Sequence, residues 1–138
     1  AQTLENIRID RICTSSLIRA RESAEILNVK LQTEIEVLDG LRERNYGVLG
    51  GLTKTEALEK YPEAVELHKN PANTDPDGES KADFEQRVLE TFEGIAKQPY
   101  ASVVVVSHGG PIKAILAYLG RPLPSSIGDG EIIEVSLP

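Results

Sequence analysis

The sequence holds one cysteine, Cys13, among its 138 residues, so a disulfide within the chain is excluded. Such sparse cysteine suits a reducing compartment, where we expect Cys13 to fill a short strand as a small hydrophobic residue. Long apolar runs are also lacking, and the first residues do not form a signal-peptide pattern. We therefore expect a cytoplasmic protein that does not associate with membranes.

Methionine and metal-binding clusters are lacking as well. Because the chain contains no methionine, Ala1 is not an initiator residue, so something preceded it or was removed. The two histidines and the single cysteine do not stand at the spacing of metal ligands. We therefore expect no metal ion and no other cofactor.

Positive charge is scarce, because 15 lysines and arginines face 22 aspartates and glutamates, for a formal net charge of -7. This surplus of negative charge argues against nucleic acid or an anionic membrane surface as a partner. It also means that a phosphate site would have to be built from a few individually placed arginines and lysines, since the overall field repels anions.

Segments of strand and helix character alternate along the chain, which is typical of α/β proteins with a largely parallel sheet. The length fits a single domain with a substantial core. Ser15 or Ser16 is expected to cap the first full helix, and Thr53 with Glu56 forms a capping-box pattern. We expect strands or extended segments at 7–14, 35–38, 102–106 and 132–137, helices at 17–27, 53–61, 80–98 and up to 119, the tail of a helix at 1–6, and an exposed loop at 70–79.

The segment Ser102–Pro111 is the most informative part of the chain. Its four consecutive valines predict a strand buried on both faces, and the glycines and Pro111 after His108 predict an immediate turn into a helix. Such a junction directs backbone N–H groups and a helix dipole at one point, which favours an anion, above all phosphate. His108 could act there as a base, a nucleophile or a charged clamp, and the alternative is a packing residue.

Three further segments combine charged residues with the start of a helix or a glycine-rich loop: Ser15–Ala24, Leu41–Gly51 and Asp77–Ser80. Together with Ser107–Gly109, their order and spacing closely resemble the histidine phosphatase superfamily, which includes the phosphoglycerate mutases and related phosphatases. The resemblance runs from about Ala1 to the C-terminus. It implies a three-layer α/β sandwich with a mostly parallel central sheet flanked by helices, and one domain over residues 1–138.

The resemblance also implies catalytic roles for three residues. Arg19 matches an arginine that clamps phosphoryl oxygens, a task suited to its fork of donors. Glu43 matches the acid that protonates the leaving oxygen, which requires a raised pKa. His108 matches the second histidine of the family, which donates a hydrogen bond to the transferring phosphoryl group and stabilises its charge. The alternatives are a solvated arginine, one more surface acid and a packing histidine.

Four further residues are expected to bind substrate. Arg44, Tyr46 and Lys54 match positions that contact the phosphate or carboxylate of the substrate in cofactor-dependent phosphoglycerate mutases. Ordinary surface charge, and packing for Tyr46, are the alternatives. Gly109 stands at a substrate-binding position where the mutases commonly carry asparagine. His68 matches no motif and is expected to be an exposed helix residue.

The family's Arg-His-Gly motif, which carries the phosphorylated nucleophile, is absent from these 138 residues. We expect the natural protein to have a further N-terminal segment with this motif and the first strand, although a fragment or a degenerate form is the alternative. This chain alone is expected to bind phosphate weakly and to form no phosphohistidine.

The sequence favours a phosphatase of small phosphorylated metabolites over a mutase. Gly109 replaces the usual asparagine, and the segment Glu66–Asp77 contains no arginine, so fewer groups would hold a bisphosphorylated intermediate and water would accept the phosphoryl group more readily. A phosphoglycerate mutase, a non-catalytic phosphate-binding remnant, and a reaction with His108 as nucleophile stay open. The oligomeric state is open too, with a homodimer as one option.

Overall fold

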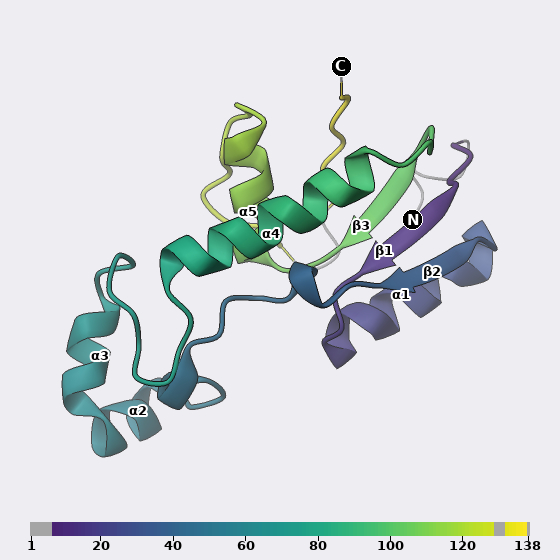
Figure 1. Ribbon diagram of the computed structural model, residues 1–138. Coiled ribbons are helices and arrows are strands. Elements are labelled where there is room, and N and C mark those ends of the chain that lie inside the picture. Colours follow the sequence, from purple (N-terminus) through teal and green to yellow (C-terminus); the bar gives the residue numbers. More distant parts are fainter. Residues whose placement is uncertain (1–6, 129–131, 138) are drawn as a thin grey trace.

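The computed structural model describes residues 7–128 and 132–137. Within them, three parallel strands form one sheet (Figure 1). Strand β1 (Arg11–Thr14) is the middle strand, with β2 (Glu34–Val37) on one side and β3 (Val103–Val106) on the other. The predicted α/β organisation with a parallel sheet is confirmed.

Helices lie on both faces of this sheet (Figure 1). Helix α1 (Ile18–Leu31) packs against all three strands and buries two of its alanines. On the other face, Ile95 of α4 (Lys81–Ala96) packs in one cluster with Cys13 of β1. Cys13 is fully buried, as expected, and this burial raises the pKa of its thiol to about 11. The thiol therefore stays protonated at neutral pH and serves as a packing group.

Helix α4 has the amphipathic character that the sequence predicts. The Ser80 side chain accepts a hydrogen bond from a backbone N–H of the first turn and so caps the helix. Phe84, Val88 and Ile95 follow at helical spacing on the buried face. One face of α4 therefore supplies much of the apolar core.

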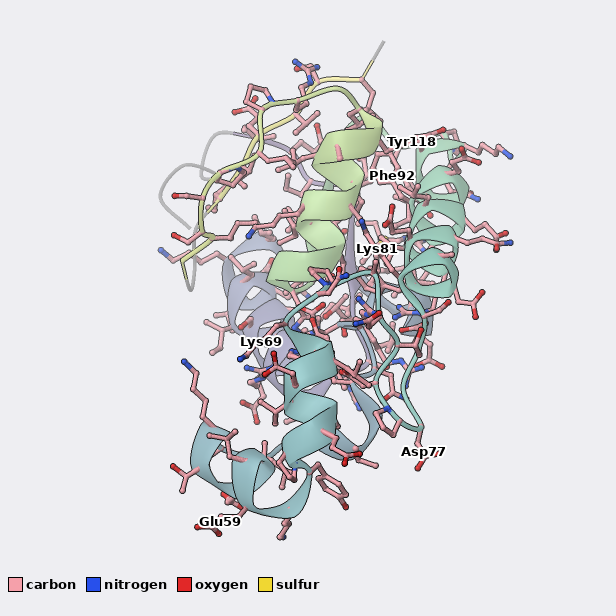
Figure 2. The ribbon with its side chains drawn as sticks, turned by 90° about the vertical axis from the view of Figure 1, so that its left-hand side faces the viewer. Glu59, Lys69, Asp77, Lys81, Phe92 and Tyr118 are labelled. Atoms are coloured by element: carbon pink, nitrogen blue, oxygen red, sulfur yellow. The ribbon has the colours of Figure 1, made fainter. Side chains whose placement is uncertain are left out.

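Helix α5 (Gly109–Tyr118) packs alongside α4. Ile115 lies in the cluster that α4 contributes, and Figure 2 shows Tyr118 beside Phe92 of α4, with ring centroids 6.5 Å apart in an edge-to-face arrangement. The chain leaves the helix at Gly120, whose φ of 69° is the left-handed conformation that favours glycine. The predicted end of this helix is confirmed.

Two short helices, α2 (Lys54–Lys60) and α3 (Pro62–His68), extend away from the sheet (Figure 1). Thr53 caps α2 by accepting the N–H of Glu56, as the capping-box pattern predicts. Proline at the first position of α3 separates the two helices. Of the helices that the structure describes, none is long and apolar enough to cross a membrane.

The four valines of β3 are half-buried, so the prediction of a strand covered on both faces is wrong. β3 is an edge strand of the described sheet, whereas β1 in the middle buries Ile12, Cys13 and Thr14 completely. An unbroken apolar run shows how apolar a strand is, but it does not show how many neighbours flank that strand.

Three local predictions are also wrong, and one falls outside the described residues. Strand β1 begins at Arg11 because its partners in β2 and β3 begin opposite that residue. Leu17 is the N-cap of α1, and the Ser15 hydroxyl accepts the N–H of Leu17 at 3.2 Å. Residues 132–137 have no regular structure and are not part of the sheet. The predicted helix tail at 1–6 lies outside the described residues.

Candidate active site

The carboxyl ends of β1 and β3 bring Ser15 and His108 together. Parallel pairing places Thr14 opposite Val106, so both segments leave the sheet at the same edge, where sites of α/β proteins are usually found. Nε2 of His108 lies 2.9 Å from Oγ of the fully buried Ser15. The hydroxyl therefore fixes the orientation of the imidazole, which stands at the N-cap of α5.

Glu43 enters the same region from the loop after β2. One carboxylate oxygen accepts the N–H of Gly110 at 3.1 Å, and the other accepts the N–H of Arg44 at 2.9 Å. A Cβ on Gly110 would lie 2.2 Å from this carboxylate, so only glycine lets Glu43 reach the first turn of α5. The glycines of this motif predict that a ligand can approach the backbone closely. At Gly110, the side chain of Glu43 makes this close approach.

The loop that holds Glu43 is also tied to the end of β3. The Ser107 hydroxyl donates a hydrogen bond to the carbonyl oxygen of Leu41 at 2.5 Å. Leu41 is fully buried in the cluster that contains Cys13 and Ile95. The acid therefore extends from a backbone segment that is fixed in the core two residues earlier.

Arg19 lies in the first turn of α1, with an exposed side chain. The pKa of His108 lies below its ordinary value, mainly because the imidazole is partly buried. The negative charge of Glu43 raises this pKa and the positive charge of Arg19 lowers it, so both charges act at the imidazole. His108 is therefore mainly neutral at pH 7, and its pKa responds to the charges of both side chains.

This arrangement predicts opposite effects of two substitutions on His108. Arg19→Gln removes a positive charge and should raise the pKa of the imidazole, whereas Glu43→Gln should lower it further. The folded state prefers the neutral imidazole, so its contribution to stability is complete above the unfolded pKa of about 6.5 and is lost as the pH falls below it. NMR titration of the two histidine rings measures the pKa directly, with His68 as the second signal. Equal values in both variants would contradict the arrangement.

The Arg44 side chain donates hydrogen bonds to backbone carbonyl groups. Its guanidinium donates to the carbonyl oxygens of Pro71, Asn73 and Glu79 at 3.0, 2.9 and 3.1 Å. The Tyr46 ring centroid lies 5.9 Å from the guanidinium carbon. Arg44 thus holds the loop at 70–79 against the loop that carries Glu43, and its expected contact with substrate stays a prediction.

Tyr46 is half-buried beside this loop, and Lys54 is exposed at the first position of α2. Burial raises the pKa of Tyr46, and the charge of Glu43 adds to the increase. Tyr46 is therefore close enough to Glu43 for the charge of the carboxylate to affect its pKa. No comparable observation links Lys54 to Glu43 in the described part of the chain. Substrate binding by these two residues and by Gly109 stays a prediction.

His68 is an exposed residue at the end of α3, as expected, and it also contacts two other side chains. Its Nδ1 lies 2.9 Å from a carboxylate oxygen of Asp75, and its ring meets Tyr46 edge to face with centroids 5.2 Å apart. Asp75 is only 4% exposed, so the prediction of an exposed loop at 70–79 is wrong at this residue. A carboxylate can be buried there because the imidazole pairs with it, and no pattern in the sequence indicates that pairing.

Among the described residues, no group of three or more histidine, cysteine, aspartate or glutamate side chains could hold a metal ion.

The model of the histidine phosphatase superfamily, branch 1, matches residues 1–132 of the chain. The chain belongs to this superfamily. The resemblance seen in the motifs is thereby confirmed.

Similar proteins include both hydrolases and mutases. The chain is 33% identical to an uncharacterized phosphatase, PhoE, of Bacillus subtilis, over 78% of this chain and 51% of that protein. It is 35% identical to a 2,3-bisphosphoglycerate-dependent phosphoglycerate mutase of Gloeobacter violaceus, over 86% of this chain and 58% of the mutase. A metal-independent phosphoserine phosphatase of Arabidopsis thaliana is 34% identical, over 85% of this chain and 50% of its own length.

Solved structures show the same fold. YhfR of Bacillus stearothermophilus superposes with a TM-score of 0.75 at 31% identity, over 88% of this chain and 62% of that one. A mycobacterial glucosyl-3-phosphoglycerate phosphatase superposes with a TM-score of 0.69 at 28% identity, over 88% and 64%. The chain thus spans between 50% and 64% of the length of these relatives.

Proposed function

We propose that this site belongs to a phosphatase that hydrolyses small phosphomonoesters through a phosphohistidine intermediate, without a metal ion. The convergence of His108, Glu43 and the first turn of α5 at one edge of the sheet carries the proposal. A histidine that can donate a hydrogen bond to a phosphoryl oxygen and an acid that can protonate the leaving oxygen suit phosphoryl transfer from an alkyl ester. The charge of Arg19 acts at the same place.

Each of these groups has a task in the proposed reaction. A histidine nucleophile, on a segment with the Arg-His-Gly motif, attacks phosphorus and forms an N–P bond while the bond to the leaving oxygen breaks. Glu43 gives its proton to that oxygen, and its carboxylate then takes a proton from the water that breaks the N–P bond. Arg19 and His108 stabilise the charge on the phosphoryl oxygens, and Ser15 holds the imidazole.

Two observations support hydrolysis of a phosphomonoester over isomerisation of a phosphoglycerate. Arg44, which matches a position that contacts the phosphate or carboxylate of the substrate in the mutases, donates to three backbone carbonyls instead. A Cβ at Gly109 would meet no described atom within 4 Å, so an open space stands where a larger side chain could hold substrate. A bisphosphorylated intermediate would therefore be held weakly, and water would reach the phosphoryl group.

The test compares phosphate release with isomerisation of 3-phosphoglycerate, using the full-length protein after its intact mass is measured. We expect phosphate release from phosphoserine and similar esters to dominate. His108→Asn should slow turnover and leave a phosphohistidine that can be labelled. Isomerisation without release would favour the mutase, and loss of the label would favour His108 as nucleophile. Phosphate binding without either reaction would leave a non-catalytic module.

A further inference from the structure

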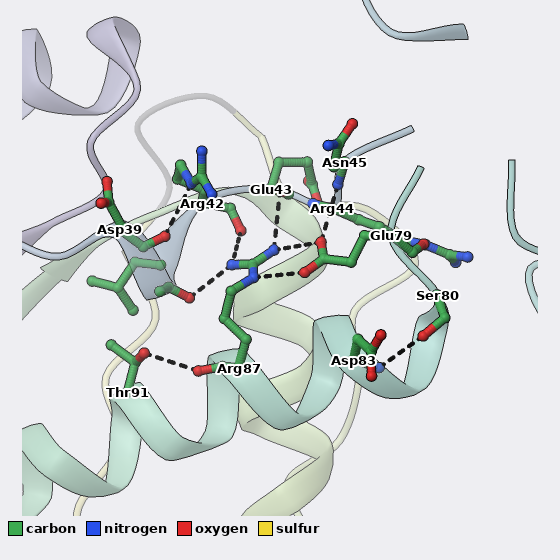
Figure 3. A network of polar contacts seen from close by, with 12 residues as sticks. Asp39, Arg42, Glu43, Arg44, Asn45, Glu79, Ser80, Asp83, Arg87 and Thr91 are labelled. Carbon is green, nitrogen blue, oxygen red and sulfur yellow. Dashed lines mark hydrogen bonds and ion pairs between the residues drawn. The ribbon is translucent and has the colours of Figure 1, made fainter. Parts of the chain in front are cut away.

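Arg87 of α4 directs its guanidinium at the loop that carries Glu43 (Figure 3). Nε donates to one carboxylate oxygen of Glu79 at 2.8 Å, and Nη2 donates to the other at 2.7 Å. Nη1 donates to the carbonyl oxygens of Gly40 and Arg42, both at 2.9 Å, and Nη2 also donates to that of Glu43 at 3.4 Å. All five N–H donors of the guanidinium are thus engaged, and none is left to bind a substrate.

Glu79 extends the same contact to the far side of Glu43. Its carboxylate accepts the N–H of Asn45 at 3.2 Å, and its own N–H donates to the carbonyl oxygen of Asn45 at 2.8 Å. The hydrogen bonds from Arg87 hold the pKa of Glu79 below its usual value, so the pair stays ionised at neutral pH. Its two side chains are only 21% and 18% exposed, which limits screening by solvent.

These contacts fix the backbone on both sides of the proposed acid. Arg87 holds the carbonyls of Gly40, Arg42 and Glu43, and Glu79 holds Asn45. Both hydrogen bonds of the Glu43 carboxylate, from the N–H groups of its neighbour Arg44 and of Gly110, depend on where this backbone lies. A small displacement of the loop would therefore move the carboxyl group away from the leaving oxygen.

We propose that Arg87 and Glu79 form a positioning pair that holds Glu43 in place to protonate the leaving group. The inference rests on the proposed function of Glu43. A bidentate guanidinium–carboxylate pair has a defined geometry that a lysine cannot reproduce, because the ammonium group is a point charge with three donors. The pair acts through Glu43 and touches no substrate itself.

The first experiment uses two substrates that differ in their need for an acid. An alkyl phosphomonoester needs a proton on its leaving oxygen, whereas p-nitrophenyl phosphate leaves as a stable anion. In single turnovers, which report the first step alone, Arg87→Lys should lower the rate of leaving-group release by about tenfold for the alkyl ester and by less than about twofold for p-nitrophenyl phosphate. Glu79→Gln should show the same split. Lys81→Gln, an exposed substitution on the same helix, should change neither.

The second measurement does not depend on catalysis. Amide hydrogen exchange at Arg44 and Gly110 should accelerate in Arg87→Lys, while exchange in β1 stays unchanged. Equal slowing of leaving-group release for the two substrates in the first turnover, or unchanged exchange at both amides, would overturn the positioning role. Failure of the unaltered protein to hydrolyse either ester would overturn the proposed function instead, and acceleration confined to the two amides would still support the clamp on the loop.

Discussion

Glu43→Gln is expected to lower kcat for alkyl phosphomonoesters by about 10²- to 10⁴-fold, the usual contribution of a general acid. Glutamine keeps the size of the side chain but has no proton to give to the leaving oxygen. The Glu43 carboxylate accepts the backbone N–H groups of Arg44 and Gly110. The amide of glutamine can accept only one of them with its oxygen, and its NH₂ group faces the other donor. Steady-state release of inorganic phosphate from the ester measures the effect.

The control for this substitution is Glu90→Gln, which removes the same charge at an exposed position of α4. It should leave kcat unchanged. In Glu43→Gln, release of p-nitrophenolate in the first turnover should stay much closer to the rate of the unaltered protein, since this leaving group needs no acid. If leaving-group release in the first turnover slowed to the same extent for both esters, Glu43 would act in another way than by protonating the leaving oxygen.

The parts of the site that the sequence reveals are those encoded within a few consecutive residues. The valine run, the glycines and Pro111 predict a strand that turns into a helix at His108, and the structure has that junction. The spacing of Phe84 and Val88 similarly predicts the buried face of α4. Local patterns of this kind depend on backbone geometry alone, so they are legible without the fold.

What the sequence hides is the pairing of distant residues. Ser15 and His108 are 93 positions apart, and Arg87 reaches carbonyls 44 to 47 positions away. These contacts are created by the register of parallel strands and by the packing of α4, neither of which leaves a periodic trace. The signal for Ser15 was its place directly after a strand, where the sequence suggested only a helix cap.

Gly47→Ala is expected to destabilise the protein by about 3 kcal/mol, more than most single substitutions. The φ of Gly47 is 57°, a left-handed conformation that costs an alanine about 1–2 kcal/mol. The added Cβ would also lie 2.0 Å from the carbonyl oxygen of Pro76 and 2.5 Å from the nitrogen of Gly78. Both are backbone atoms, so the loop that follows Glu43 and the loop at 70–79 would have to separate.

Gly51→Ala provides the matched control, because Gly51 has a φ of 75° but a Cβ there would meet no described atom within 4 Å. This variant should lower the free energy of unfolding only by the cost of the left-handed conformation, about 1 kcal/mol. The difference between the two variants in chemical denaturation then isolates the steric conflict at Pro76. Equal losses would mean that the two loops yield freely. A larger loss at Gly47 would show that they form one rigid unit, which is what a fixed position of Glu43 requires.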